Sequence, residues 1–388
     1  MGDEVLSKFR VKADRILVIS FLCVICLPLL GTFFHLASAP DPLRGESTGR
    51  LPRPRADITS LAAWPAGFDS YIRSNLGFRN LLIRWNGVLK VEWLKVSCSP
   101  RVLLGKDGWL YTNAGGCYND YRGLRPFPEG KLAAWQRELE ARRDWLAARG
   151  IRYLLVIAPE AYRIYPEFTP ANLPRVKEQS RLDEFVAYLK AHSDVTVLDL
   201  RPALLKEKAR GRLYYKTDPH WNELGAYFAY REIILTLRQW FPKLQPAHLS
   251  NFIVVTTTEP GGGLARWLGM KEVLTEERIA LRPKRPRLAK EVAGATAPQV
   301  REKIEVVFQE KYVTEAPQAA IPRGVMFRDS YAIALMPFLS EHFGRMTYFE
   351  RGTFCFDKTL VERERPQVVI QEMVEGSLLS RKLPEKPD

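Results

Sequence analysis

The sequence predicts an α/β fold in which a mostly parallel β-sheet lies between two layers of helices, after one N-terminal transmembrane helix. From residue 131 onward, amphipathic helical segments alternate with short apolar segments rich in β-branched residues, which is typical of buried parallel strands. Residues 16–39 contain no Asp, Glu, Lys or Arg. With 388 residues, of which 46% are hydrophobic, the chain can form one large domain or two smaller ones.

The uncharged run 16–39 predicts a membrane span. At about 1.5 Å of rise per residue, it can cross a hydrocarbon core of about 30 Å. Basic residues in 1–15 favour a cytoplasmic N-terminus, but arginines also follow at 44–55, so charge alone does not settle the orientation. Ala-Ser-Ala at 37–39 is similar to a signal-peptidase site, although Pro40 should hinder cleavage. We expect an uncleaved signal anchor.

The composition after the anchor predicts the division of the chain. Residues 40–65, rich in Pro, Arg, Gly and Ser, predict an extended linker, 66–380 the main domain, and 381–388 a tail. The formal net charge of +14 suits an anionic polysaccharide, a membrane surface or nucleic acid. No zinc-ligand spacing or RNA-binding signature supports nucleic acid, and a generally basic surface would explain the charge equally well.

The first helix–strand repeats suggest where ligands bind. We expect a helix over 131–149, closed by Gly150, then a buried strand over 151–158. A helix over 181–192 and a strand over 195–200 follow. Ligands bind beyond the carboxyl ends of strands in open α/β sheets, so the loop after residue 158 should line the site. Its side chains Glu160, Tyr162 and Arg163 could equally be solvated.

The later segments complete the predicted sheet around an insertion. We expect a helix over 221–240 and an insertion at about 250–320, in which Gly261–263 forms a turn rather than a phosphate-binding loop. Strands are expected at 323–327, 346–349 and 367–373. Between the first two, a polar turn at Ser330 should lead into a helix that runs through Phe343 and is closed by Gly344, with Pro337 delaying or kinking it.

The stretch Tyr-Tyr-Lys-Thr-Asp-Pro-His-Trp-Asn at 214–222 carries the strongest chemical signal. Asp218 and His220 supply an orienting acid and a base, two of the three members of a nucleophilic triad. Ser330, at the end of an apolar run, is the candidate nucleophile. Asp218 is also a good N-cap for a helix with Pro219 at its first position. Both roles are compatible, and Ser330 by itself could be an ordinary loop serine.

Four motifs in the same order resemble the alginate O-acetyltransferase family, the SGNH-hydrolase-like enzymes that modify exopolysaccharides. They are Gly-Lys-Asp-Gly-Trp-Leu-Tyr at 105–111, the 214–222 stretch, Phe-Arg-Asp-Ser-Tyr at 327–331 and Arg-Pro-Gln-Val-Val-Ile-Gln-Glu at 365–372. The resemblance covers roughly 68–379. Many relatives have Gly-Asp-Ser at the nucleophile, where this chain has Arg328. The absence of a further carbohydrate-binding module makes the chain more similar to the membrane-anchored J-type than to the longer X-type.

The resemblance implies a function and a location. Asp218, His220 and Ser330 would form the triad of an O-acetyltransferase, in the permuted order with the histidine before the serine. The domain 66–380 would lie in the periplasm, anchored to the inner membrane. A membrane-bound O-acyltransferase would supply acetyl groups, an exopolysaccharide would accept them, and no metal or organic cofactor would be needed. The alternatives are a secreted carbohydrate acetylesterase, whose hydrolysis could also be a side activity, and a non-catalytic scaffold of an export complex.

Further residues complete the expected site. The backbone N–H of Ser330 is the natural oxyanion donor. Side chains next to the triad or in the loop after residue 158 are candidate substrate contacts: Trp221, Tyr331, Arg328, Tyr162 and Arg163.

Two cysteines could be joined in an oxidising compartment. Cys98 and Cys117 bracket a loop-rich stretch, and a bridge there would contribute about 3 kcal/mol. Two reduced thiols are the alternative.

Overall fold

The computed structural model describes residues 2–34, 51–53, 57–292, 311–316, 319–350 and 354–380. The chain forms two units, one of residues 1–98 with 266–270 and one of 99–265 with 271–388. The predicted boundary at residue 66 therefore lies inside the first unit. The predicted tail, 381–388, lies outside the described residues.

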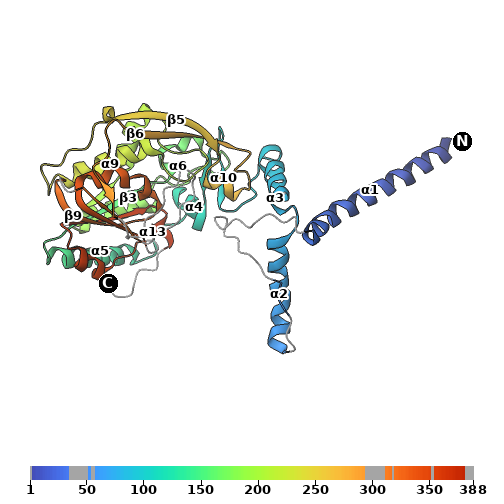
Figure 1. Ribbon diagram of the computed structural model, residues 1–388, viewed down its shortest axis with the longest axis horizontal. Coiled ribbons are helices and arrows are strands. Elements are labelled where there is room, and N and C mark those ends of the chain that lie inside the picture. Colours follow the sequence, from blue (N-terminus) through green and yellow to red (C-terminus); the bar gives the residue numbers. More distant parts are fainter. Residues whose placement is uncertain are drawn as a thin grey trace. The chain divides into compact units, whose positions relative to one another are not determined.

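The first unit is helical (Figure 1). It contains α1 (Gly2–Phe33), α2 (Ile58–Asn75), α3 (Arg79–Val88) and the π-helical turn η2 (Leu89–Trp93). Asp14–Thr32 within α1, with a mean hydropathy of 2.3, is long and apolar enough to cross a membrane, a property that an N-terminal signal sequence shares. Most of the predicted linker lies outside the described residues. Its last part is helical, because Asp57 caps α2 by accepting a hydrogen bond from Ser60 N.

A seven-stranded sheet forms the centre of the second unit and confirms the α/β class. Its order is β4 (Val197–Asp199), β3 (Arg152–Ala158), β11 (Val368–Val374), β9 (Ile321–Phe327), β10 (Phe343–Phe349), β8 (Lys311–Glu315) and β7 (Lys290–Glu291). The first five strands are parallel, whereas β8 and β7 are antiparallel to their neighbours. The carboxyl ends of β4, β3, β11 and β9 consequently meet at one edge.

Helices cover both faces of this sheet. Alternate residues of β3 point to opposite faces, as the strand period of two requires. Leu154 and Val156 join a core with α9 (Glu223–Leu237) and α11 (Met336–Leu339), whereas Leu155 and Ile157 join a second core with α5 (Lys131–Ala147), α7 (Arg181–His192) and α12 (Lys358–Glu364). Figure 1 shows β3 and β9 between α9 and α5. The three-layer prediction is thereby confirmed.

The predicted helix through Phe343 is wrong. The chain instead forms three short helical turns, η7 (Ser330–Ala334), α11 and η8 (Ser340–His342), and Phe343 begins β10. Pro337 lies in the first turn of α11, where a missing N–H is harmless. Gly344 lies in β10 and is not a cap. A Cβ there would lie 2.7 Å from Pro322 O of the neighbouring strand, so the position has no room for a larger residue.

The insertion contains a regular hairpin. Strands β5 (Phe252–Pro260) and β6 (Thr275–Pro283) pair antiparallel along their full length, with α10 (Gly263–Trp267) after β5. Residues 293–310 lie outside the described part. The remaining elements are β1 (Val102–Leu104), β2 (Leu110–Thr112), α4 (Cys117–Tyr121), α6 (Ala161–Ile164), α8 (Arg201–Glu207), α13 (Ser377–Ser380) and the 3₁₀ turns η3 (Ala114–Gly116), η4 (Pro166–Phe168), η5 (Lys208–Arg210) and η6 (Leu249–Asn251).

The predicted disulfide between Cys98 and Cys117 is not formed in the structure. The stretch between them folds as the β1–β2 hairpin, and Cys117 then turns into α4 and is buried in the core. Each thiol faces a backbone carbonyl instead: Cys98 Sγ lies 3.3 Å from Leu268 O, and Cys117 Sγ lies 3.5 Å from Thr112 O. Burial also raises the pKa of Cys117, which keeps it protonated.

Candidate active site

The structure brings Asp218, His220 and Ser330 into one hydrogen-bonded row. Nδ1 of His220 lies 2.6 Å from Asp218 Oδ1, and Nε2 lies 2.9 Å from Ser330 Oγ. The side chain of Asp218 is 14% exposed and that of His220 is 31% exposed. At these distances the imidazole, oriented by the acid, can deprotonate the hydroxyl, whose oxygen can then attack a carbonyl carbon.

The Asp–His pair lies in a loop before α9. Asp218 Oδ1 also accepts the backbone N–H of His220 at 3.1 Å, so both ends of the Asp-Pro-His turn are fixed. Asp218 does not cap the helix. Asn222 is the N-cap, and its Oδ1 accepts N–H groups from Leu224 and Gly225, both at 3.0 Å.

The glycine turn of the insertion supports Asp218 from the other side. Gly263 N donates a hydrogen bond to Asp218 Oδ2 at 2.7 Å. A Cβ at Gly262 would lie 2.6 Å from Asp218 Cβ, so only glycine permits this approach of the backbone. The turn predicted at 261–263 therefore also positions the orienting acid.

Ser330 lies just beyond the carboxyl end of β9, where Asp329 holds the turn. Asp329 Oδ1 accepts Tyr331 N at 2.9 Å, and Oδ2 accepts Val374 N at the end of β11 at 2.7 Å. Asp329 N donates to Glu372 Oε2 at 3.0 Å. The serine is thus fixed by two neighbouring parallel strands.

The environment of Glu372 favours the protonated form of its carboxyl group. Burial raises its pKa well above the usual range, and the adjacent charge of Asp329 adds to this effect. Burial also raises the pKa of Asp329, against hydrogen bonds from Val374 N and Tyr331 N. One proton shared between two buried carboxyl groups avoids placing two negative charges behind the nucleophile.

All five candidate substrate contacts are buried, and all but Arg163 support the site from behind. Trp221 Nε1 donates to Tyr331 O at 3.0 Å, and Tyr162 OH lies 3.5 Å from Cys117 O. Arg328, where many relatives have glycine, forms a buried ion pair with Glu350 and donates to Asp329 O. Arg163 lines a cavity, described below.

Glu160 and Tyr331 brace the Asp-Pro-His turn. The hydroxyl of Tyr331 lies 2.7 Å from Pro219 O and 2.9 Å from Glu160 Oε2. A phenol has one proton to donate, and a backbone carbonyl can only accept. If Tyr331 donates to Pro219, both contacts are satisfied only when Glu160 is protonated and donates to the phenol oxygen. Burial and the charge of Glu375 raise the pKa of Glu160 to about 8, consistent with this assignment.

The groups around the row keep the pKa of the base, His220, close to neutral pH. Burial would raise the pKa of Asp218, but His220 and the hydrogen bonds from His220 and Gly263 outweigh it and lower the pKa to about 2. For His220, burial lowers the pKa, whereas the charge of Asp218 and the hydrogen bond to it raise the pKa; the net shift is upward from 6.5. Asp218 therefore stays ionised and stabilises the imidazolium.

No part in the site was predicted for Asp329, Glu372, Gly262 or Asn222. For two of these residues the sequence contains a local indication of their role. Asn222 precedes a helical pattern as a cap should, and Glu372 ends one of the motifs that carried the resemblance. The support of Asp218 by Gly262 depends on two segments about 45 residues apart, for which the sequence offers no local sign.

Fold and site together define an SGNH-hydrolase-like α/β protein with a Ser–His–Asp row at the carboxyl edge of its sheet. The model of the family "SGNH hydrolase-like domain, acetyltransferase AlgX" matches residues 102–313. The chain therefore belongs to this family. The match includes Asp218 and His220 and ends before Ser330.

Individual relatives agree with this assignment. The probable alginate O-acetylase AlgJ of Pseudomonas aeruginosa is 31% identical over 129 residues, which are 33% of this chain and 30% of the relative. The match thus spans about a third of that protein. Among solved structures, a DHHW family protein from Eubacterium siraeum has a TM-score of 0.54 at 16% identity, covering 73% of this chain and 96% of that one. Bacillus cereus PatB1 with a sulfonyl adduct has 0.53 at 14%, covering 74% and 100%. These two similarities concern the fold.

Proposed function

We propose that the chain is an O-acetyltransferase that transfers acetyl groups to hydroxyls of an exopolysaccharide through an acetyl-serine intermediate. The observation that carries the proposal is the Asp218–His220–Ser330 row at 2.6 and 2.9 Å. Membership of the AlgX acetyltransferase family and the similarity to a probable alginate O-acetylase support the acetyl group and the polysaccharide.

The reaction has two balanced half-steps. In the first, Ser330 Oγ attacks the acetyl carbonyl while His220 Nε2 takes its proton, and the proton then goes to the departing group of the donor. In the second, His220 deprotonates a sugar hydroxyl, whose oxygen attacks the acetyl-serine. The Ser330 oxygen leaves and recovers the proton from His220. The backbone N–H of Ser330 would stabilise the oxyanion in both steps.

The location and the donor are part of the proposal. With α1 as an anchor in the inner membrane, residues 99–388 would act in the periplasm next to a membrane-bound O-acyltransferase that supplies acetyl groups. The candidate span Asp14–Thr32 supports this location. No step of the chemistry requires a metal or an organic cofactor.

An assay of transfer against hydrolysis tests the function. The full chain is incubated with an acetyl ester, with and without an oligosaccharide acceptor, and acetylated sugar and free acetate are measured by mass spectrometry. We expect acetylated sugar from the wild type and none from Ser330→Ala, while Ser250→Ala, at an exposed serine, keeps full activity. Acetate alone would identify an acetylesterase. Acetylated sugar from Ser330→Ala at the wild-type rate would rule out Ser330 as the nucleophile, and neither product from the wild type would leave only the scaffold.

A further inference from the structure

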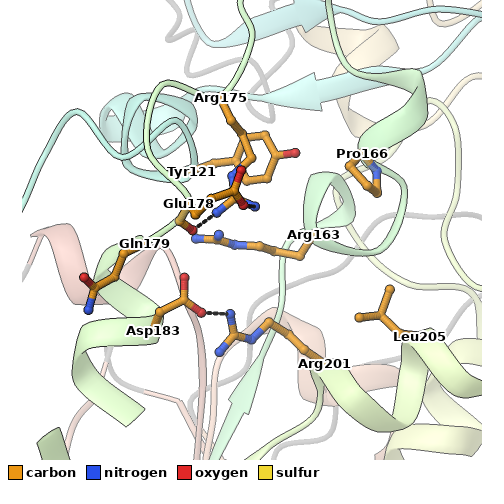
Figure 2. A pocket seen from close by; sticks show the side chains of 9 residues that line it. All are labelled: Tyr121, Arg163, Pro166, Arg175, Glu178, Gln179, Asp183, Arg201 and Leu205. Atoms are coloured by element: carbon orange, nitrogen blue, oxygen red, sulfur yellow. Dashed lines mark hydrogen bonds and ion pairs between the residues drawn. The ribbon is translucent and has the colours of Figure 1, made fainter. Parts of the chain in front are cut away.

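A cavity of about 430 Å³ lies beyond the carboxyl ends of β3 and β4 (Figure 2). Its walls come from α4, from the segment after β3, from the loop before α7, and from α7 and α8. The lining residues are Tyr121, Arg163, Pro166, Arg175, Glu178, Gln179, Asp183, Arg201 and Leu205. Figure 2 shows the three arginines directed toward one space.

Two arginines present buried N–H groups that have no acceptor among the described residues. Arg163, whose side chain is 4% exposed, binds Glu375 through Nε at 2.8 and 3.1 Å, but its Nη2 has no hydrogen bond. The nearest acid to Nη2 is Asp120, at 3.6 Å. Arg175 Nε is also buried without a partner. A buried donor without an acceptor costs about 1–3 kcal/mol, so a ligand that supplies acceptors would be stabilised here.

The charges of the cavity select the kind of ligand. Arg201 is satisfied by Asp199, at 2.7 Å, and by Asp183. Arg175 donates through Nη2 to the backbone carbonyl of Glu178, and its Nη1 lies 3.4 Å from the Glu178 carboxylate, whose side chain is 97% exposed. Because acids balance the arginines, an isolated anion gains little. Hydroxyl groups both donate and accept, and they suit a mixed lining of guanidinium, carboxylate and amide groups.

The shape and the position suit a sugar. The volume lies at the lower end of the range for small-molecule pockets, which is about 300–1,000 Å³. Tyr121 supports the guanidinium groups of Arg163 and Arg175, at 5.1 and 5.2 Å from its ring centre, and holds their planes in place. β3, which precedes Arg163, lies two strands from β9, which precedes Ser330. That separation is roughly 10 Å at the edge of the sheet.

We propose that this cavity is a remote subsite that holds a hydroxyl-rich sugar unit of the acceptor polymer while another unit of the same chain lies at Ser330. The inference rests on the proposed function. Arg163 and Arg175 would donate to sugar oxygens, Glu178 would swing outward, and Leu205 and Pro166 would contact the apolar face of the ring. A polymer long enough to reach both places would bind more tightly than one that fills the catalytic edge alone.

Binding of oligosaccharides to the full-length Ser330→Ala chain tests the subsite apart from catalysis. Calorimetry compares short and long members of an alginate series and of a neutral cello-oligosaccharide series. On this background, Arg175→Gln removes the guanidinium group, whose Nε has no acceptor among the described residues, and Leu205→Trp fills the cavity. Arg238→Gln, at an exposed arginine at the far end of α9, is the charge-matched control.

We expect Arg175→Gln to bind long oligosaccharides about tenfold more weakly, because one charge-assisted hydrogen bond is lost. Leu205→Trp should weaken the same binding because the indole occupies the space of the sugar. Short oligosaccharides and the control should be unaffected. Equal affinity of the long oligosaccharides for all variants, or no gain in affinity with length in either series, would overturn the subsite. Normal acetyl transfer by Ser330→Ala would instead overturn the proposed function, with the binding results still standing.

Discussion

At the scale of single residues, Asp218, His220 and Ser330 should act as one unit, because each is hydrogen-bonded to the next. Replacing any one by Ala should lower acetyl transfer on the order of a thousandfold or more. The losses should not add in double variants, since the first substitution already disables the row. Steady-state kinetics of the three single and three double variants, with circular dichroism as the folding control, measure this. Additive losses would mean independent roles.

Glu160 should make stability depend on pH. Its pKa is raised to about 8 in the folded chain from an ordinary value of 4.5, so the folded state holds its proton more tightly. Its contribution to stability is fully present below pH 4.5 and is lost as the pH rises through about 8. The groups around it are Glu375, Tyr331, His220, Asp329, Cys117, Tyr162 and Tyr214.

Glu160→Gln removes this titration but keeps a donor for the oxygen of Tyr331. The free energy of unfolding of the variant should therefore fall less between pH 5 and pH 8 than that of the wild type, by on the order of 3 kcal/mol. Urea unfolding across this range measures the difference, and Glu272→Gln, at an exposed acid, is the control. Parallel pH profiles of wild type and Glu160→Gln would mean that Glu160 is ionised in the fold.

At the scale of elements, the insertion is part of the active site, because the glycine turn between β5 and β6 holds Asp218. Gly262→Ala would place a Cβ 2.6 Å from Asp218 Cβ and push the acid away from His220. Acetyl transfer should fall at least tenfold, while the fold, whose main sheet lies elsewhere, is retained.

A second glycine separates displacement of the acid from general strain. Gly150 has φ of +70° with nothing near its missing Cβ, so Gly150→Ala strains the backbone without touching the site. It should lower the melting temperature and keep the specific activity. If Gly262→Ala were as active as the wild type, the turn would have no part in positioning Asp218.

At the scale of the whole molecule, α1 should anchor the chain with the second unit outside the cytoplasm. The candidate span Asp14–Thr32 is the reason. Protease added outside spheroplasts should digest residues 99–388, and a cytoplasmic marker should survive. The full-length chain should sediment with membranes. A domain protected until the spheroplasts are lysed would place the enzyme on the other side.

The sequence by itself determined the class of the fold and the three residues of the hydrogen-bonded row. Hydrophobic periodicity is a local property, so it predicted α7, α5, β3 and β11 to within a few residues. Asp218 and His220 were predicted as an orienting acid and a base, and the structure places Asp218 Oδ1 2.6 Å from His220 Nδ1. Ser330 was found as the polar end of an apolar strand.

Only the tertiary structure decided what surrounds those three residues. The proton on Glu160 follows from acceptors on two other segments, and Asp329 is fixed by backbone from β11. Substrate contact was predicted for Trp221, Tyr162 and Arg328 because they lie next to the triad or in the loop after residue 158, yet burial makes them supports. Residue type and spacing encode which chemistry is possible, whereas burial and the count of donors and acceptors depend on segments brought together by folding, which no local pattern records.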